Sequence, residues 1–174
     1  MREGRLFDPA VGGGAILDMG GYPVSVAIAI ARWAGETERA DLVSAEADLG
    51  PTGVDESAVC TLRIGTIAAE LAATIVDDAP ASTVVEGTRG TLTIDHLLGS
   101  RTRSGSSLVL QRTGEAPITV QAATVNPLAS EADAVGRALQ GGSTEALEMP
   151  WEQSAEIARV LAVWRASITP GGGS

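Results

Sequence analysis

The sequence has few of the residues that cross-link chains or bind metals. It holds one cysteine, Cys60, and one histidine, His96, and aromatic side chains make up 3% of it. A single cysteine excludes an intrachain disulfide and gives no indication of an oxidising compartment. No spacing of His, Cys, Asp and Glu matches a zinc or di-metal set, so we expect no metal role for His96 or Cys60. With so few aromatics, the core is expected to consist of Ala, Val, Leu and Ile.

Positive charge is also scarce. Twelve basic against 22 acidic residues give a formal net charge of −10, which repels nucleic-acid phosphates and anionic bilayers. We therefore expect neither a nucleic-acid nor a membrane partner. The longest apolar-rich stretch, Ala15 to Ala34, is interrupted by polar residues, and the chain starts without a hydrophobic signal region. A cytoplasmic location is the default expectation.

The composition is that of a globular protein, with 44% apolar and 20% charged residues. A chain of 174 residues usually forms one domain and buries roughly 70% of its unfolded surface. We expect one domain over residues 1–168 and a flexible, glycine-rich tail over 169–174.

A helical repeat of apolar residues follows the glycines at 12–14. The repeat predicts a helix packed on one face, from Ile16 to a natural stop at Gly35. Its apolar residues are Met19, Val26, Ile30 and Trp33, with the small residues Ala27 and Ala34 beside them. Pro23 either kinks this helix or lies in the first turn of a longer one.

The apolar period then changes from helical to two. Alternation on both sides of Gly65-Thr66 predicts a hairpin of residues 58–64 and 67–75. Further strands are expected at 42–49, 83–86, 91–94, 108–111 and 118–121. Because short turns join them, they predict one mainly antiparallel sheet.

Helical spacing returns at the end of the chain. It predicts helices over Leu128–Leu139, with Val135 and Leu139 inward, and over Trp151–Ser167. The fold class is therefore α+β: an open, mainly antiparallel β-sheet with helices packed on one face. Several strands carry small apolar residues at both alternating positions. The uncovered face is thus expected to be a large apolar patch and a subunit or domain contact.

Asp18 and Tyr22 are the most informative polar pair. In a continuous helix they are four residues apart and share a face. A carboxylate beside a phenol can orient it and tune its proton affinity. A tyrosine with a pKa of about 10 needs a nearby cation to lose its proton near neutrality, and this segment offers none. The alternative is a solvated or capping Asp18 and a core Tyr22.

The other polar segments are weaker candidates. The glycines at 12–14 do not form a dinucleotide fingerprint, because Leu17 stands where a third glycine is needed and no strand leads into them. Cys60 is expected to be a small core residue. Asp55 and Glu56 follow Gly53 and are expected to be solvated turn residues. The serines of residues 104–107 are expected to form a loop.

Several segments occur in an order that is specific as a set. They are Arg5 to Pro9, Gly12 to Val24 (GGGAILDMGGYPV), Thr52 to Glu56 and Glu86 to Leu92, followed by Glu131 and Met149-Pro150. From Arg5 to Ile168 the chain resembles the C-terminal domain of Gfo/Idh/MocA oxidoreductases, in particular their dihydrodiol-dehydrogenase-like branch.

The resemblance implies that a second domain binds the cofactor while this one binds the substrate. In that family a Rossmann domain binds NAD or NADP and supplies a lysine from a Glu-Lys-Pro motif, while the C-terminal domain binds substrate and often dimerises. Neither the fingerprint nor the motif occurs here. The implied reaction is hydride transfer between the nicotinamide and a carbon bearing a hydroxyl. Tyr22 stands where many members carry His or Tyr, Asp18 is the acid four residues earlier, and the missing lysine would be the cation that Tyr22 needs. Gly12, Gly13 and Gly14 are expected to lie near substrate or cofactor, or to have a purely conformational role.

Two hypotheses follow for function. The first is the substrate-binding and dimerisation half of an NAD(P)-dependent oxidoreductase acting on a sugar, polyol or dihydrodiol, inactive alone and binding no cofactor by itself. The second is a non-catalytic binding or assembly module that uses the exposed sheet face.

Overall fold

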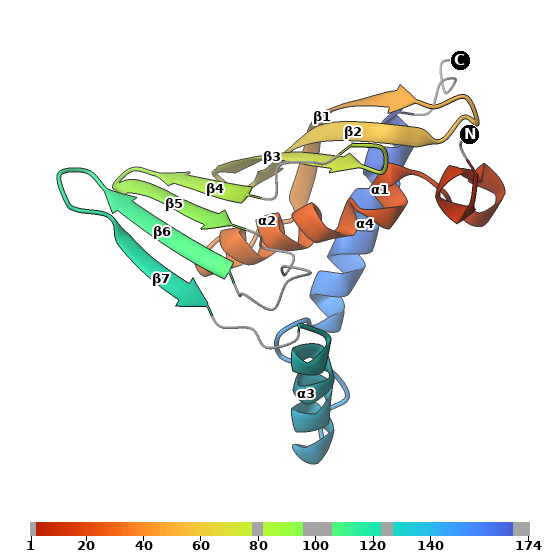
Figure 1. Cartoon of the computed structure of the whole chain (residues 1–174). Helices are drawn as coiled ribbons and strands as arrows, with labels where there is room; N and C mark the ends of the chain where they lie inside the picture. Colours follow the sequence, from red (N-terminus) through yellow and green to blue (C-terminus); the bar gives the residue numbers. More distant parts are fainter. Residues whose placement is uncertain (1–2, 78–81, 96–105, 123–126, 169–174) are drawn as a thin grey trace. The chain divides into compact units, whose positions relative to one another are not determined.

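The structure is a computed structural model that describes residues 3–77, 82–95, 106–122 and 127–168 (Figure 1). His96, Ser104 and the expected tail at 169–174 lie outside the described residues. Its elements follow in the order η1 (Arg5–Phe7), η2 (Pro9–Val11), α1 (Ala15–Asp18), α2 (Gly21–Trp33), β1 (Ala40–Leu49), β2 (Asp55–Ile64), β3 (Ile67–Thr74), β4 (Ser82–Gly87), β5 (Gly90–Asp95), β6 (Ser106–Arg112), β7 (Ile118–Ala122), α3 (Pro127–Gln140) and α4 (Trp151–Ile168).

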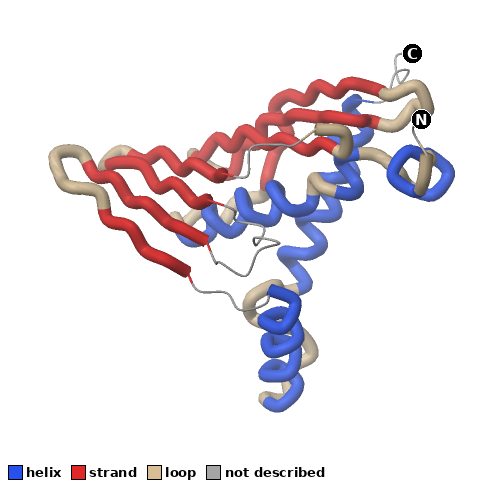
Figure 2. Tube along the Cα trace, viewed as in Figure 1, coloured by secondary structure: helices blue, strands red, loops and turns tan. Residues whose placement is uncertain are grey.

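The predicted α+β class is confirmed, but the strands form two sheets instead of one (Figure 2). Strands β1-β2-β3 make one antiparallel sheet and β4-β5-β6-β7 another. The chain also divides into two compact units. Unit 1 contains residues 1–79 and 149–174, and unit 2 contains residues 80–148. Unit 1 is therefore built from the two ends of the sequence.

In unit 1 the predicted hairpin is confirmed as β2 and β3. Gly65 makes the turn at a φ of 58°, a left-handed angle that glycine adopts without steric cost. The register pairs Cys60 with Leu71 and Leu62 with Ala69, so these side chains point to one face of the sheet. That face is apolar and forms the floor of the core.

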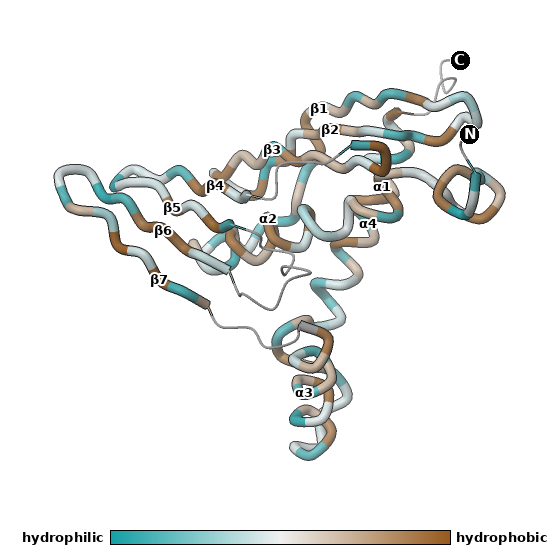
Figure 3. The backbone as a smooth tube through the Cα atoms, viewed as in Figure 1, coloured by the Kyte–Doolittle hydropathy of each residue, from teal (hydrophilic) through white to brown (hydrophobic). Residues whose placement is uncertain are grey.

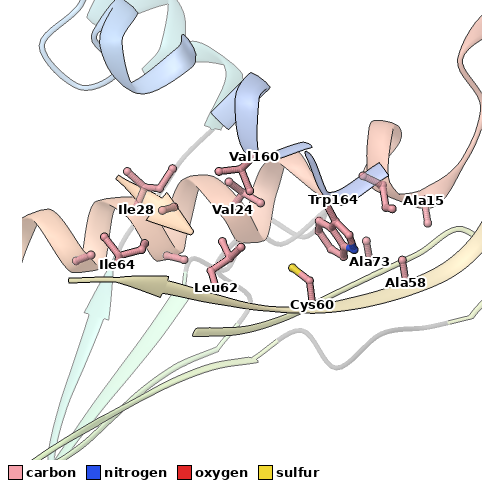
Figure 4. Packing of buried hydrophobic residues seen from close by; sticks show 14 residues of the cluster. Ala15, Val24, Ile28, Ala58, Cys60, Leu62, Ile64, Ala73, Val160 and Trp164 are labelled. Atoms are coloured by element: carbon pink, nitrogen blue, oxygen red, sulfur yellow. The ribbon is translucent and has the colours of Figure 1, made fainter. Parts of the chain in front are cut away.

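Three helices cover this apolar face. α1, α2 and α4 pack on β1–β3, and α4 also contacts both other helices. Trp164 of α4 is fully buried among small residues that include Ala58, Cys60 and Ala73 (Figure 4). A core of Ala, Val, Leu and Ile around one large aromatic matches the composition, and the expected core position of Cys60 is confirmed. Burial raises the pKa of the Cys60 thiol to about 12, which leaves it uncharged at neutral pH.

The buried face of α2 differs from the predicted one. Val24, Ala27, Ile28 and Ala31 face the core, whereas Trp33 is 83% exposed. The prediction followed the largest apolar residues, but the close approach of α2 to the sheet favours the stripe that contains two alanines. Pro23 lies in the first turn of α2, which decides between the two alternatives for this residue.

Unit 2 is a four-stranded meander followed by α3. Register places Val85, Leu92, Leu110 and Ile118 in one row across one face of the sheet, with Ile94 and Leu108 in the next. Hydrophobic segments recur along these strands (Figure 3). Val135 and Leu139 of α3 are exposed, so the prediction that they face inward is wrong. Both residues do lie in a helix, as their spacing predicts. The spacing alone could not show whether their side chains are buried.

A buried carboxylate joins the last helix to the first strand. Glu156 of α4 accepts the backbone N–H of Ala40 at 2.8 Å and two bonds from Arg159, at 2.7 and 2.8 Å. Arg159 also donates to the Ala40 carbonyl. The Arg159 hydrogen bonds lower the pKa of Glu156 to about 2. This cluster fixes the position of α4 on the edge of β1.

A second buried carboxylate joins β2 to the glycine turn. Asp55 is only 4% exposed and accepts the Ile16 N–H through Oδ2 at 2.6 Å. Asp55 and Glu56 are both buried, so the prediction that they are solvated turn residues is wrong. A buried Asp is stable where it meets backbone donors, here at the start of α1. A Cβ at Gly14 would lie 2.2 Å from Asp55 Oδ1, so only glycine fits there.

No single helix in the described ranges has the length and apolar character needed to cross a membrane. The bent pair of Pro9–Asp18 and Gly21–Trp33 meets that requirement by length and composition only.

We predict that Glu156→Gln lowers the free energy of unfolding by about 2 kcal/mol at pH 7, because it removes a charged acceptor from buried donors. The pKa of Glu156 in the folded chain, about 2, is below the ordinary value of 4.5. The carboxylate therefore stabilises the fold above about pH 4.5 and loses this effect as the pH falls towards 2. Urea unfolding at pH 7, 5 and 3 measures both effects. Glu152→Gln, on the exposed start of the same helix, is the control. An equal loss in both variants would contradict the assignment.

We predict that Gly14→Ala destabilises unit 1 more than Gly53→Ala does. Both glycines have positive φ, 120° and 86°, but a Cβ at Gly53 meets nothing within 4 Å. Gly53→Ala therefore reports the conformational cost alone, about 1 kcal/mol, whereas the clash with Asp55 raises the cost at Gly14 to about 3 kcal/mol. Thermal and urea unfolding measure the difference. Equal costs would show that Asp55 does not pack against the turn.

Candidate functional site

The two predicted catalytic residues lie on either side of a helix break. Asp18 is the last residue of α1 and Tyr22 is in the first turn of α2. Met19 and Gly20 link them with right-handed helical backbone angles, so the spacing of about one turn is retained. Gly20 is required at the break, because a Cβ there would lie 2.5 Å from the Ile16 carbonyl oxygen.

Tyr22 is accessible, at 50% exposure. The alternative in which Tyr22 is a core aromatic is therefore wrong. Its backbone carbonyl accepts a hydrogen bond from Ser25 Oγ at 2.8 Å, which ties the residue to the first turn of α2. The backbone of Tyr22 is thus held by the helix, while half of the residue's surface is accessible.

Asp18 pairs with a cation that the sequence analysis did not find. Arg5 Nη2 donates to Asp18 Oδ1 at 2.5 Å, and the Asp18 side chain is only 22% exposed. Within the described residues Asp18 makes no hydrogen bond with Tyr22. The expected orientation of the phenol by the carboxylate is therefore replaced by an ion pair on the preceding turn.

The glycine turn contacts its own chain. The Gly13 and Gly14 N–H groups donate to the carbonyls of Asp8 and Leu6, both at 2.9 Å. Both glycines are buried, whereas Gly12 is half-buried with a φ of 75°. These amides are occupied, and the Asp55 carboxylate beside them would repel a phosphate. The turn therefore does not fit the pyrophosphate of a dinucleotide.

Two hollows on the described part of unit 1 have linings that do not include Asp18 or Tyr22. One, of about 130 Å³, is lined by Pro9, Gly13, Leu49, Gly53, Val54, Asp55, Arg165 and Ile168. Its volume is below the roughly 300 Å³ at which ligand pockets begin. The other, of about 440 Å³, is a shallow depression across β1–β3 around Val59. Neither of these two hollows therefore forms a cleft at Asp18 and Tyr22.

The candidate site contains no cluster that could hold a metal. In the described part of the chain, no group of three or more His, Cys, Asp and Glu side chains comes together. Cys60 is buried in the core, away from solvent.

Sequence reasoning missed the residues that hold the site in place. Arg5 is 13 positions from Asp18 and Asp55 is 39 positions from Ile16, so no helical or strand period relates them. The only signal was indirect, because Arg5 and Asp55 each belong to a segment of the ordered set that carried the family resemblance.

Comparison with known proteins agrees with that resemblance. The family model "GFO/IDH/MocA C-terminal domain" matches residues 1–93. Comparison with curated proteins finds no significant match. Among solved structures, the 3-ketoreductase KijD10 from Actinomadura kijaniata, in complex with NADP and TDP-benzene, has a TM-score of 0.78 at 18% identity, over 95% of this chain and 49% of that one. A tyrosine-to-phenylalanine variant of KijD10 has a TM-score of 0.75, also at 18% identity, with 95% and 49% covered.

A second enzyme shares the fold. UDP-N-acetylglucosamine 3-dehydrogenase GnnA from Acidithiobacillus ferrooxidans has a TM-score of 0.73 at 15% identity, over 92% of this chain and 48% of that one. The chain thus spans about half the length of the solved structures it matches. Because the family model covers more than half of its residues, the chain belongs to the GFO/IDH/MocA C-terminal domain family.

Proposed function

We propose that this chain is the substrate-binding half of an NAD(P)-dependent oxidoreductase that acts on a CH–OH group of a sugar, polyol or dihydrodiol. The observation that carries the proposal is the accessible Tyr22, about one helical turn from the Arg5-Asp18 ion pair in unit 1. The names of the similar structures, a 3-ketoreductase and a nucleotide-sugar dehydrogenase, support a sugar as the substrate.

In this proposal Tyr22 exchanges a proton with the substrate hydroxyl, and Asp18 accepts a hydrogen bond from a hydroxyl nearby. A tyrosine requires a neighbouring cation to ionise near neutrality. All twelve basic residues of this chain are arginines, and a guanidinium does not exchange protons at physiological pH. A lysine for proton transfer would therefore come from the partner domain.

The cofactor is proposed to bind outside this chain. The glycine turn does not fit a pyrophosphate, since its amides are bonded to Asp8 and Leu6 and face the Asp55 carboxylate. KijD10 was solved with NADP, which favours NADP over NAD for the whole enzyme. When bound, the cofactor would supply the hydride acceptor or donor, and the residues of this chain would hold the substrate and carry its proton.

We predict that the genomic sequence upstream of codon 1 encodes a glycine-rich βαβ unit, and that co-expressing this half with the chain gives nicotinamide-dependent turnover. The panel to assay is glucose, myo-inositol, trans-benzene dihydrodiol and UDP-N-acetylglucosamine, each with NAD⁺ and NADP⁺. Tyr22→Phe should lower kcat by at least about 100-fold, the usual scale for loss of an acid or base.

Trp33→Phe, at the exposed far end of α2, is the matched control and should leave kcat unchanged. Wild-type turnover in Tyr22→Phe would remove the proton-transfer role. No turnover in any combination would count against the enzyme proposal.

The outer face of β1–β3 favours a second role, in self-association. Helices cover the other face, and this one is hollowed around Val59, which is 51% exposed. This face is not the large apolar patch that the sequence predicts. Val59, Ala68 and Ala72 are bordered by Asp41, Glu46, Asp48, Glu70 and Arg63. We propose that two chains dimerise through the apolar centre and that the four acids oppose this pairing.

We predict that the chain dimerises more tightly at 0.5 M than at 0.05 M NaCl, because salt screens repulsion between the facing carboxylates. Val59→Glu should give a monomer at both salt concentrations, whereas Val163→Glu, on the exposed side of α4, should not. Light scattering and sedimentation measure the oligomeric state. A monomer at every concentration, or a dimer unaffected by Val59→Glu, would reject this face as the contact.

A further inference from the structure

The Arg5-Asp18 ion pair is held by the backbone on both sides. Asp18 is the last residue of α1, a short helix whose first turn is bonded to Asp55. Arg5 belongs to η1, which folds back over the glycine turn. There the carbonyls of Leu6 and Asp8 accept the N–H groups of Gly14 and Gly13, each at 2.9 Å. Main-chain hydrogen bonds therefore hold the backbone of Arg5 close enough for its guanidinium to reach Asp18.

The fit of η1 to the turn is close. A Cβ at Gly13 would lie 2.6 to 2.9 Å from the carbonyl oxygens of Leu6, Asp8 and Arg5. Only glycine allows the N-terminal segment to approach this near. The same contact that makes Gly13 necessary thus places Arg5 within reach of α1.

The two carboxylate oxygens of Asp18 differ in their hydrogen bonds. Oδ1 accepts the hydrogen bond from Arg5 at 2.5 Å. Within the residues that the structure describes, Oδ2 accepts no hydrogen bond. An Asp with one oxygen held by a guanidinium keeps the other oxygen available to accept a hydrogen bond from a ligand hydroxyl.

We infer that Arg5 is a positioning residue for the substrate site: it holds Asp18 Oδ1 so that Oδ2 accepts a hydrogen bond from a hydroxyl of a polyhydroxylated substrate. This inference rests on the proposed function of Asp18 and Tyr22. Arg5 acts through Asp18, since its own charge does not change and it supplies no proton. A single hydrogen-bond acceptor selects substrates that carry a hydroxyl beside the reacting carbon.

The test compares Arg5→Ala and Arg5→Lys with Arg137→Ala. Arg137 is the matched control because it also forms an exposed ion pair, with Glu148 at 2.7 Å, and both residues belong to unit 2. In the isolated chain, NMR records the Asp18 carboxyl carbon and backbone amide. Arg5→Ala should shift both signals, Arg5→Lys should shift them less, and Arg137→Ala should leave them unchanged. Melting temperatures should be similar for all three variants.

The enzyme reconstituted with its cofactor half supplies the functional readout. Loss of one charge-assisted contact should raise KM for the hydroxylated substrate about tenfold while kcat changes much less. Arg5→Lys should recover part of the loss, because it keeps the charge but not the planar geometry. A purely structural role would instead lower the melting temperature and reduce the amount of active enzyme without changing KM.

The two readouts separate the possible failures. Unchanged Asp18 signals in Arg5→Ala would overturn the inference. If Arg5→Ala shifts the Asp18 signals but has the same KM as Arg137→Ala, the inference is also overturned, because Arg5 would then hold Asp18 without any effect on substrate binding. If the wild type has no turnover while Arg5→Ala still shifts Asp18, the proposed enzyme function fails, and with it the substrate role of the pair, although the ion pair itself is real.

Discussion

The Asp55 carboxylate lies at the start of β2 and bonds to the backbone where α1 begins. This contact connects the sheet to the segment that carries Asp18 and, one turn later, Tyr22. A carboxylate loses its hydration when it is buried, and backbone donors are what compensate for that loss. The glycine turn, the short α1 and the break before α2 all have positions set by this contact. The candidate site therefore depends on a residue that does not face substrate.

Most of the fold could be predicted because period-two and helical patterns depend on local geometry alone. The hairpin of β2 and β3, the core position of Cys60 and the extent of α4 all follow from alternation or helical spacing. The failures concern which surfaces meet. The size of Trp33 favoured the wrong face of α2, and the spacing of Val135 and Leu139 could not show that they are exposed. Periodicity defines a stripe, but the shape of the neighbouring element decides whether the stripe is buried.

Only part of the candidate site could be predicted from the sequence. Asp18 and Tyr22 could be selected because their spacing lies within one helical turn and because they match a family pattern. Arg5 and Asp55 could not be assigned roles, since their partners are distant in sequence and each looks like an ordinary surface residue. Buried charges are rare, so an expectation of solvation is usually correct for Asp. Their roles appear only when the chain is folded.

Unit 1 has a discontinuous core, and this has a consequence for synthesis. The sheet and α2 leave the ribosome first, whereas the helix that supplies Trp164 follows only after all of unit 2 has been translated. Until then the apolar inner face of β1–β3 lacks α4 and is a target for chaperones or for aggregation. Slow translation of residues 80–148 would prolong that exposure. Folding yield in the cell should therefore depend on codon usage in a segment that lies outside unit 1.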